Sequence, residues 1–88
     1  MTTIQQIRKR DGRIVPFEPS KIHIAIGKAF IAVGRKDKDE SKNLSYQVIE
    51  NLEKIFRDKI PGVEDVQDLV EEILMKNNYG DVAKAYIL

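Results

Sequence analysis

Basic residues gather around a sharp turn near the start of the chain. They are Arg8, Lys9, Arg10 and Arg13. One acid, Asp11, lies among them, and Lys21 follows where a first helix is expected to begin. The start of a helix carries free N–H groups and a partial positive charge, so it favours anions. If the turn folds beside this helix, Lys9, Arg10 and Lys21 converge. Three cations in one place suit a polyphosphate better than a single carboxylate.

Apolar residues near this cluster would provide a slot for a base. Ile7, Val15 and Ile22 lie close to the basic positions, and Val63 stands where it would close the far side at the start of a later helix. The Glu18 carboxylate can accept a hydrogen bond from an exocyclic amine, which adenine has at its six-position and guanine lacks there. These residue types fit a nucleotide pocket, and a solvated turn without a ligand is the other interpretation.

The composition excludes several classes of protein. The chain has 88 residues, no cysteine, and 15 Lys and Arg residues against 14 Asp and Glu, a net charge of +1. Without cysteine there is no disulfide scaffold, thiol nucleophile or zinc ribbon. No apolar run approaches the roughly 18 residues of a membrane span, and the Walker A and nucleophile-elbow patterns are absent. We expect a cytoplasmic, non-catalytic domain with no protein-bound metal and no membrane contact. The balance of charges argues against bulk attraction to nucleic acid.

The first third of the chain has the pattern of a hairpin followed by a helix. Two extended runs, 4–10 and 13–17, flank Asp11-Gly12, which predicts a two-residue type I′ loop. Ser20 is expected to cap the first helix, and Gly34 is expected to end it in a left-handed conformation. The buried face of this helix repeats at helical spacing. It consists of Ile22, Ala25, Ile26, Ala29, Phe30 and Val33.

Three further helices are predicted after a charged connector. Residues 35–43 are expected to form a solvated loop, because their acids and bases nearly cancel. The second helix presents on one face Leu44, Val48, Leu52, Ile55 and Phe56. The third buries Val66, Leu69, Val70, Ile73 and Leu74. The fourth, with Asp81 as its cap, carries Val82, Ala83, Tyr86 and Ile87.

The predicted fold class is therefore α+β. An N-terminal β-hairpin or small sheet packs on a four-helix bundle, and residues 1–88 form a single domain. The apolar pattern of the last helix is still running at Leu88. We therefore expect the chain to be a fragment of a larger protein.

Several stretches of the sequence resemble the ATP-cone domain. The first is the hairpin sequence IRKRDGRIVPF at 7–17, with Lys21-Ile22 after it. The stretches VEDVQDLVE at 63–71 and VAKAYIL at 82–88 resemble the third and fourth helices of that family. The match covers nearly the whole chain in the right order. It implies a small sheet that covers a four-helix bundle, with ATP or dATP bound between the hairpin and the helices.

The resemblance also implies which residues contact the ligand. Lys9, Arg10 and Lys21 match phosphate-contacting positions, while Ile7 and Glu18 match positions near the base. The complete base and ribose pocket is expected to be Ile7, Val15, Glu18, Ile22, Val63 and Gln67. Two members of this set depart from the family pattern. Val63 stands where some ATP-cones have a hydroxyl residue, and Gln67 stands where some have a phosphate-binding histidine.

The family implies regulation rather than catalysis. ATP or dATP would be the effector, with Mg²⁺ carried by the nucleotide, and the domain would allosterically control an attached ribonucleotide reductase. Its partners would be the catalytic domain of that reductase or another cone. Cones also occur behind a zinc ribbon in a repressor and beside a P-loop kinase, but the chain has neither cysteine nor a G-x-x-x-x-G-K motif. A reductase of the anaerobic or cobalamin-dependent type is slightly favoured as the parent.

Two other functions are open on the sequence alone. A small module with a basic hairpin could bind nucleic acid through Arg8, Arg10 and Arg13, and its binding would then be sensitive to salt and indifferent to adenine. Alternatively, the bundle could serve dimerisation alone.

Overall fold

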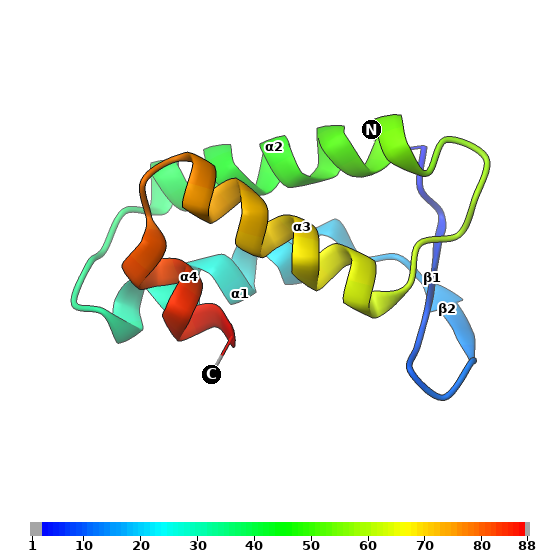
Figure 1. Ribbon diagram of the computed structural model, residues 1–88, viewed down its shortest axis with the longest axis horizontal. Coiled ribbons are helices and arrows are strands. Elements are labelled where there is room, and N and C mark those ends of the chain that lie inside the picture. The colour runs from blue at the N-terminus through cyan, green and yellow to red at the C-terminus, as the bar shows by residue number, and fades with distance from the viewer. Residues whose placement is uncertain (1–2, 88) are drawn as a thin grey trace.

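The computed structural model describes residues 3–87, and over this range a two-stranded hairpin precedes four helices (Figure 1). The elements are β1 (Gln6–Arg8), β2 (Ile14–Pro16), α1 (Pro19–Ala32), α2 (Lys38–Ile55), α3 (Val63–Lys76) and α4 (Gly80–Ile87). The predicted α+β class and the order of the elements are confirmed. Leu88, where the predicted domain ends, lies outside the described residues, as do residues 1 and 2.

The hairpin differs from the predicted type I′ turn. Strands β1 and β2 are antiparallel with Ile7 opposite Val15, but the loop has three residues, 10–12. The Lys9 N–H donates to the Arg13 carbonyl at 2.7 Å, and the Gly12 N–H donates to the Lys9 carbonyl at 2.9 Å. A type I′ turn needs positive φ at both central residues. Here positive φ is confined to Gly12, at 91°, so the two-residue prediction is wrong.

Main-chain bonds join the hairpin to the start of α3. The Arg8 N–H donates to the Pro61 carbonyl at 2.9 Å, and Arg8 forms a parallel bridge with Gly62. The Gly62 N–H in turn donates to the Asp65 carboxylate at 2.8 Å. Ile4, just before β1, is buried in the core. The hairpin is therefore fixed against the start of α3 and the core.

Helix α1 begins one residue before the predicted cap. Its N-cap is Glu18, with Pro19 in the first turn, where the fixed φ of proline suits a helix and its missing N–H costs nothing. Ser20 therefore lies inside the helix, and its predicted capping role is wrong. The predicted end is confirmed. Gly34 has a φ of 78°, and the Arg35 N–H reaches back to the Phe30 carbonyl at 2.9 Å, as in a Schellman motif.

Helix α2 begins well before the predicted Leu44. Asp37 is its N-cap, and the Asp37 carboxylate accepts the Glu40 N–H at 3.0 Å. This bond satisfies a free donor of the first turn, so much of the predicted charged loop is helical. The buried face also starts earlier, at Ser41. Ile55 is 59% exposed, so its predicted place in the core is wrong.

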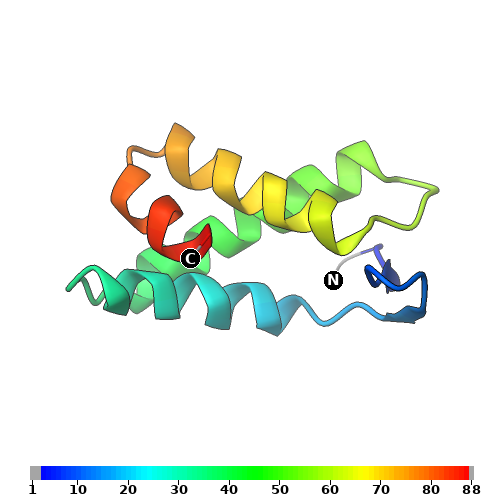
Figure 2. The same ribbon diagram turned by 60° about the horizontal axis from the view of Figure 1, so that its bottom comes forward.

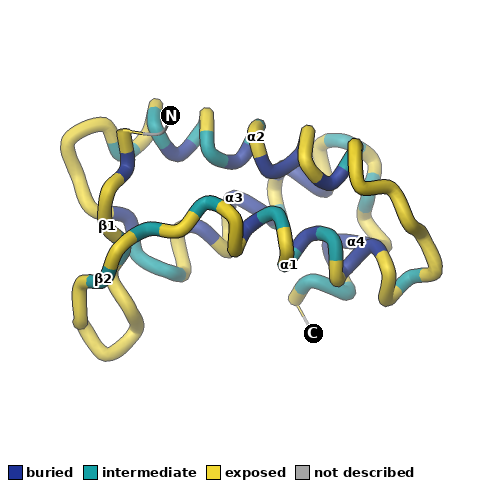
Figure 3. The backbone as a smooth tube through the Cα atoms, turned by 180° about the vertical axis from the view of Figure 1, so that it is seen from behind, coloured by how far each residue is buried: buried dark blue, intermediate teal, exposed yellow. Residues whose placement is uncertain are grey.

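The core lies where the inner faces of the helices meet (Figure 3). The predicted buried face of α3 is confirmed. It consists of Val66, Leu69, Val70, Ile73 and Leu74. Helix α4 buries Val82 and Ala83, but Ile87 is 60% exposed, contrary to prediction. Asp81 does not cap this helix. The Tyr79 carbonyl accepts the Ala83 N–H, and Asp81 pairs with Arg35 at 3.0 Å.

Helix α4 lies between α1 and α3 and packs against both (Figure 2). It occupies one end of the molecule, and the hairpin occupies the other. The space between α1 and α3 is therefore closed by a helix at one end and by the hairpin at the other. This arrangement positions the candidate site.

Candidate functional site

A cavity of about 450 Å³ lies between the hairpin, the first turns of α1 and the start of α3. This volume is in the range of small-molecule sites. The cavity collects residues that are far apart in the sequence. From the predicted set, its lining includes Ile7, Lys9, Val15, Glu18, Lys21, Ile22, Val63 and Gln67. The structure therefore brings the turn of the hairpin and the first turn of α1 to the same cavity. Lys9 and Lys21 can contact one ligand only if these two elements lie side by side.

The inner part of the cavity is apolar. Ile7 and Val15 face one another across the hairpin, and buried Ile22 and Val66 line the cavity from α1 and α3. Val63 adds a branched side chain at the start of α3. This surface can cover the face of a flat ring without leaving polar atoms unpaired.

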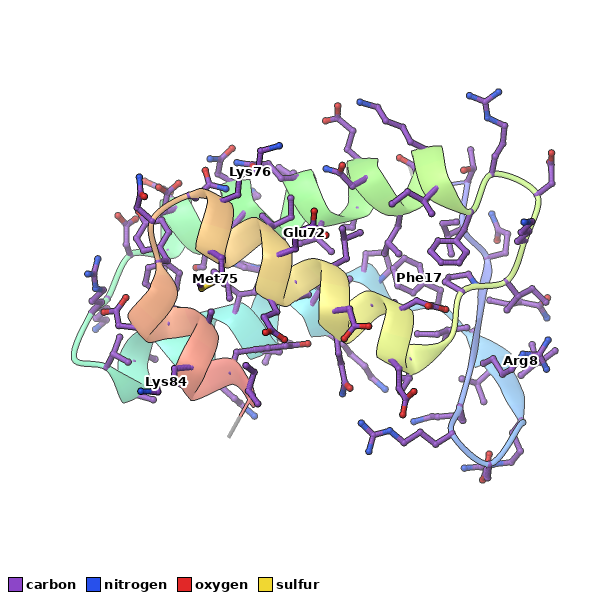
Figure 4. The ribbon with its side chains drawn as sticks, in the orientation of Figure 1. Arg8, Phe17, Glu72, Met75, Lys76 and Lys84 are labelled. Carbon is purple, nitrogen blue, oxygen red and sulfur yellow. The ribbon has the colours of Figure 1, made fainter. Side chains whose placement is uncertain are left out.

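Three aromatic or small residues of the lining were not predicted to belong to the site. Phe17 points from the end of β2 toward the helices (Figure 4) and packs against the core. Ala25 lines the cavity one helical turn after Lys21. The spacing of four residues from Lys21 would have predicted this position. Tyr86 comes from α4, and burial raises the pKa of its phenol. Its hydroxyl therefore stays protonated and can donate a hydrogen bond.

Lys9 and Lys21 bring positive charge to the cavity from two different elements. The ammonium of Lys21 lies 2.8 Å from a carboxylate oxygen of Glu18. The hydrogen bond from Lys21, together with its charge, lowers the pKa of Glu18. Both side chains are largely exposed at the rim, so the pair can exchange its partner for a ligand.

Arg10, a predicted phosphate ligand, lies outside this cavity. Its guanidinium donates from Nη2 to Oε1 of Gln67 at 2.9 Å, and its Nε lies 3.6 Å from Oε1 of Glu64. The hairpin loop is thereby connected to the first turns of α3. Sequence spacing did not indicate this contact, because the partners are more than fifty positions apart.

The other two arginines of the turn do not line the cavity. Arg8 projects outward from β1 (Figure 4). Arg13 contacts the Asp11 carboxylate at 2.7 Å. The backbone and side-chain hydrogen bonds from Arg13 lower the pKa of Asp11. The charge of Arg13 is therefore used within the loop.

Charged groups outside the cavity do not add to the candidate site. Lys84 projects from α4 at the end of the molecule opposite the hairpin (Figure 4). Between residues 3 and 87, no group of three or more His, Asp or Glu side chains is arranged to hold a metal ion. No described helix is long and apolar enough to cross a membrane.

The hairpin thus closes one end of the helical bundle over an apolar cavity that Lys9 and Lys21 line. Residues 5–88 match the family described as the ATP cone domain. The chain belongs to this family. In ribonucleotide reductases, the ATP-cone is a regulatory nucleotide-binding domain and is not itself catalytic.

Curated relatives agree with this family. The chain is 40% identical over 90 residues to a vitamin B12-dependent ribonucleoside-diphosphate reductase of Thermoplasma acidophilum, a match that covers 97% of the chain and 11% of the relative. It is 35% identical over 83 residues to the reductase of that name in Mycobacterium tuberculosis, covering 94% and 11%. It is 34% identical over 94 residues to a ribonucleoside-diphosphate reductase subunit alpha of Chlamydia pneumoniae, covering 99% and 9%. The chain thus spans about a tenth of the length of these relatives.

Proposed function

We propose that the cavity binds ATP or dATP and that its occupancy allosterically controls a ribonucleotide reductase to which the domain is attached. One observation carries the proposal. Lys9 from the hairpin and Lys21 from α1 line the same cavity as the apolar pair Ile7 and Val15. A site with cations and an apolar wall in one hollow suits a ligand with a triphosphate and a base.

In this proposal the base lies against the apolar wall. Ile7 and Val15 cover one side of the ring, and Ile22 and Val63 cover the other. The Glu18 carboxylate accepts a hydrogen bond from the adenine amine once Lys21 has turned to the phosphates. Because guanine lacks an amine at that position, it would leave the carboxylate without a donor, and ATP is favoured over GTP.

In the same proposal, the triphosphate lies beside the two lysines of the cavity. Lys9 and Lys21 contact it directly, and charge-assisted hydrogen bonds of this kind are stronger than neutral ones. The nucleotide would bring its own Mg²⁺, held by its phosphates, and no residue of the cone is proposed as a ligand of the ion. Gln67 contributes an amide at the ribose or phosphate end.

Regulation requires more than tight binding. ATP and dATP differ by one 2′-hydroxyl, whose hydrogen bond contributes about 1 kcal/mol. That difference shifts an equilibrium only if the two nucleotides favour different arrangements of the domain. The arrangement then decides whether the cone docks on the catalytic domain or on another cone. No catalytic residue of the cone takes part.

Thermal unfolding tests the proposed ligand. If ATP binds with a dissociation constant near 10 µM, 1 mM ATP adds about 2.7 kcal/mol to the free energy of unfolding. For a chain of this size, the melting temperature rises by about 10 °C or more. GTP and inorganic triphosphate are expected to give smaller shifts. A melting curve that neither ATP nor dATP moves would contradict the proposal.

Two lysine variants test the site within the same experiment. Lys21→Ala is expected to lose most of the ATP-induced shift, because it removes a cation from the cavity. Lys28→Ala, in the same helix but outside the cavity lining, is the matched control and is expected to keep the full shift. A full shift in Lys21→Ala would exclude the proposed phosphate contacts.

The nucleic-acid alternative has less support than the nucleotide site. Of its three arginines, Arg13 is held by the Asp11 carboxylate within the loop, and the chain as a whole has a net charge of only +1. A salt-sensitive shift caused by a DNA or RNA oligonucleotide, with none caused by ATP, would favour that alternative.

A further inference from the structure

We propose that Glu64 and Gln67 act as a latch that holds the Arg10 guanidinium at the edge of the cavity until a triphosphate replaces them as its partner. The inference rests on the proposed function, because it concerns how that site receives its ligand. It assigns a role to Glu64, which neither the sequence pattern nor the cavity lining indicates. The contacts of Arg10 with Glu64 and Gln67 are called the Arg10 latch below.

The position of Arg10 is the first observation. Its neighbour Lys9 lines the main cavity, whereas the Arg10 side chain lines a smaller hollow of about 260 Å³ between the hairpin and the start of α3. The two hollows share Lys9 and Val63. The Arg10 guanidinium also donates to Gln67, which lines the main cavity, so a guanidinium that leaves Glu64 is already beside the cavity.

The strength of the Arg10 latch is the second observation. The Arg10 and Glu64 side chains are 65% and 74% exposed, and the two atoms are 3.6 Å apart. An ion pair in water at this distance contributes little to stability. A triphosphate offers several negative charges and the paired oxygens that a guanidinium binds best. The ion pair is thus weak enough to yield to the ligand, while the hydrogen bond from Arg10 to Gln67 at 2.9 Å keeps the guanidinium beside α3 until then.

The consequence is a coupling between nucleotide binding and the surface of α3. When Arg10 turns to the phosphates, Glu64 loses its positive partner and the Gln67 carbonyl loses its donor. The first turns of α3 then become more negative and less tied to the hairpin. Binding must also displace the Arg10 latch, so Glu64 lowers the affinity for the nucleotide.

A double-mutant cycle measures this competition. Dissociation constants for ATP are determined by calorimetry for the unaltered chain, Glu64→Gln, Arg10→Ala and the double variant. Glu64→Gln is expected to tighten ATP binding by about two- to five-fold, the range of an exposed ion pair. In the Arg10→Ala background, the same change is expected to have a smaller effect, because there is no latch to release.

The control is Glu72→Gln. Glu72 lies in the middle of the same helix, away from the hairpin (Figure 4), and has the same charge. It is expected to leave the affinity nearly unchanged. If Glu64→Gln acts only by removing repulsion from the phosphates, its effect will be at least as large without Arg10 as with it. That result would overturn the Arg10 latch, as would an unchanged or weaker affinity in Glu64→Gln.

Two further results separate failure of the latch from failure of the site. If the unaltered chain binds no ATP by calorimetry, the proposed function falls, and the inference falls with it. If it binds ATP and the cycle shows no coupling between positions 10 and 64, only the latch is excluded. Amide relaxation of the ligand-free chain adds a readout that needs no nucleotide. Asp11 and Gly12 are expected to be more mobile in Glu64→Gln than in Glu72→Gln, and equal mobility would also count against the latch.

Discussion

The carboxylate of Glu18 and the ammonium of Lys21 are 2.8 Å apart at the rim of the cavity. The hydrogen bond from Lys21 and its charge hold the pKa of Glu18 below the ordinary value of 4.5. Glu18 thus stays charged to a lower pH than an isolated glutamate. The stability that the pair adds is present above the ordinary pKa and is lost as the pH falls through the lowered one.

Titration of Glu18 by carbon NMR tests this pairing. In the ligand-free chain, the midpoint is expected below 4.5, the ordinary value for this carboxyl. In Lys21→Ala the midpoint is expected to return to that value, because the hydrogen bond and the charge are both removed. A midpoint that does not move between the two proteins would show that Glu18 and Lys21 are not paired in solution.

Most lining residues of the cavity could be predicted from the sequence. The residues that pair with its charged side chains could not. Ile7, Val15 and Ile22 were predictable because a two-residue strand repeat and a helix start fix where they point. The contacts of Arg10 were not predictable, because Glu64 and Gln67 reach it only after α3 has folded beside the hairpin. Long exposed side chains have many rotamers, and sequence spacing does not choose among them.

At the scale of elements, the ends of the helices differ most from the prediction. The helix interiors follow the apolar repeat, whereas α1 starts at Pro19 without a side-chain cap and α2 starts at the capping residue Asp37. Asp37 followed by Glu40 was a usable signal for the start of α2. The high charge of 35–43 concealed it, because a solvated helix turn and a solvated loop have the same composition.

Gly27 inside α1 and Gly34 just after it allow a matched test of how this helix ends. Gly34 has a φ of 78°, and a Cβ there would meet no atom within 4 Å. Gly34→Ala is therefore expected to lower the free energy of unfolding by about 1 kcal/mol through backbone strain alone. Gly27→Ala, inside the helix and equally unobstructed, is expected to raise it by about 0.5–1 kcal/mol. Urea unfolding measures both, and a loss of stability in Gly27→Ala would contradict this account of the helix.

At the scale of the whole molecule, the two ends of the bundle are built differently. The end opposite the hairpin is held by a cluster around Tyr79. The Tyr79 hydroxyl donates to Glu40 at 2.6 Å, and the Arg35 guanidinium lies over its ring at 5.4 Å while pairing with Asp81. These contacts join the end of α1 to the starts of α2 and α4. The hydrogen bond to the Glu40 carboxylate raises the pKa of Tyr79.

Tyr79→Phe separates stability from binding. The loss of a hydrogen bond to a carboxylate is expected to lower the free energy of unfolding by about 1–2 kcal/mol. The affinity for ATP is expected to stay the same, because the cluster and the cavity share no residue. Urea unfolding and calorimetry on the same protein measure the two effects. A clear loss of ATP affinity would show that the two ends of the bundle are coupled.

The order and class of the elements could be predicted because each helix carries its own apolar repeat. The position of α4 between α1 and α3 could not be derived from the repeats, since any helix with one apolar face can pack in several places. The contribution of Tyr86 to the cavity follows from that position alone. The resemblance to the ATP-cone family predicted how the hairpin covers the helices, which the apolar repeats alone do not determine.

The most direct test of the account is chemical-shift mapping of the nitrogen-labelled chain during titration with ATP. The amides that shift most are expected to be those of the hairpin and of the first turns of α1 and α3, with Ile7, Lys21 and Val63 among them. The amides around Tyr79 are expected to stay in place. Saturable shifts confined to the outer face of α1 or to the Tyr79 end, with the hairpin amides unmoved, would contradict the claim that the hairpin and the two helix starts hold the nucleotide together.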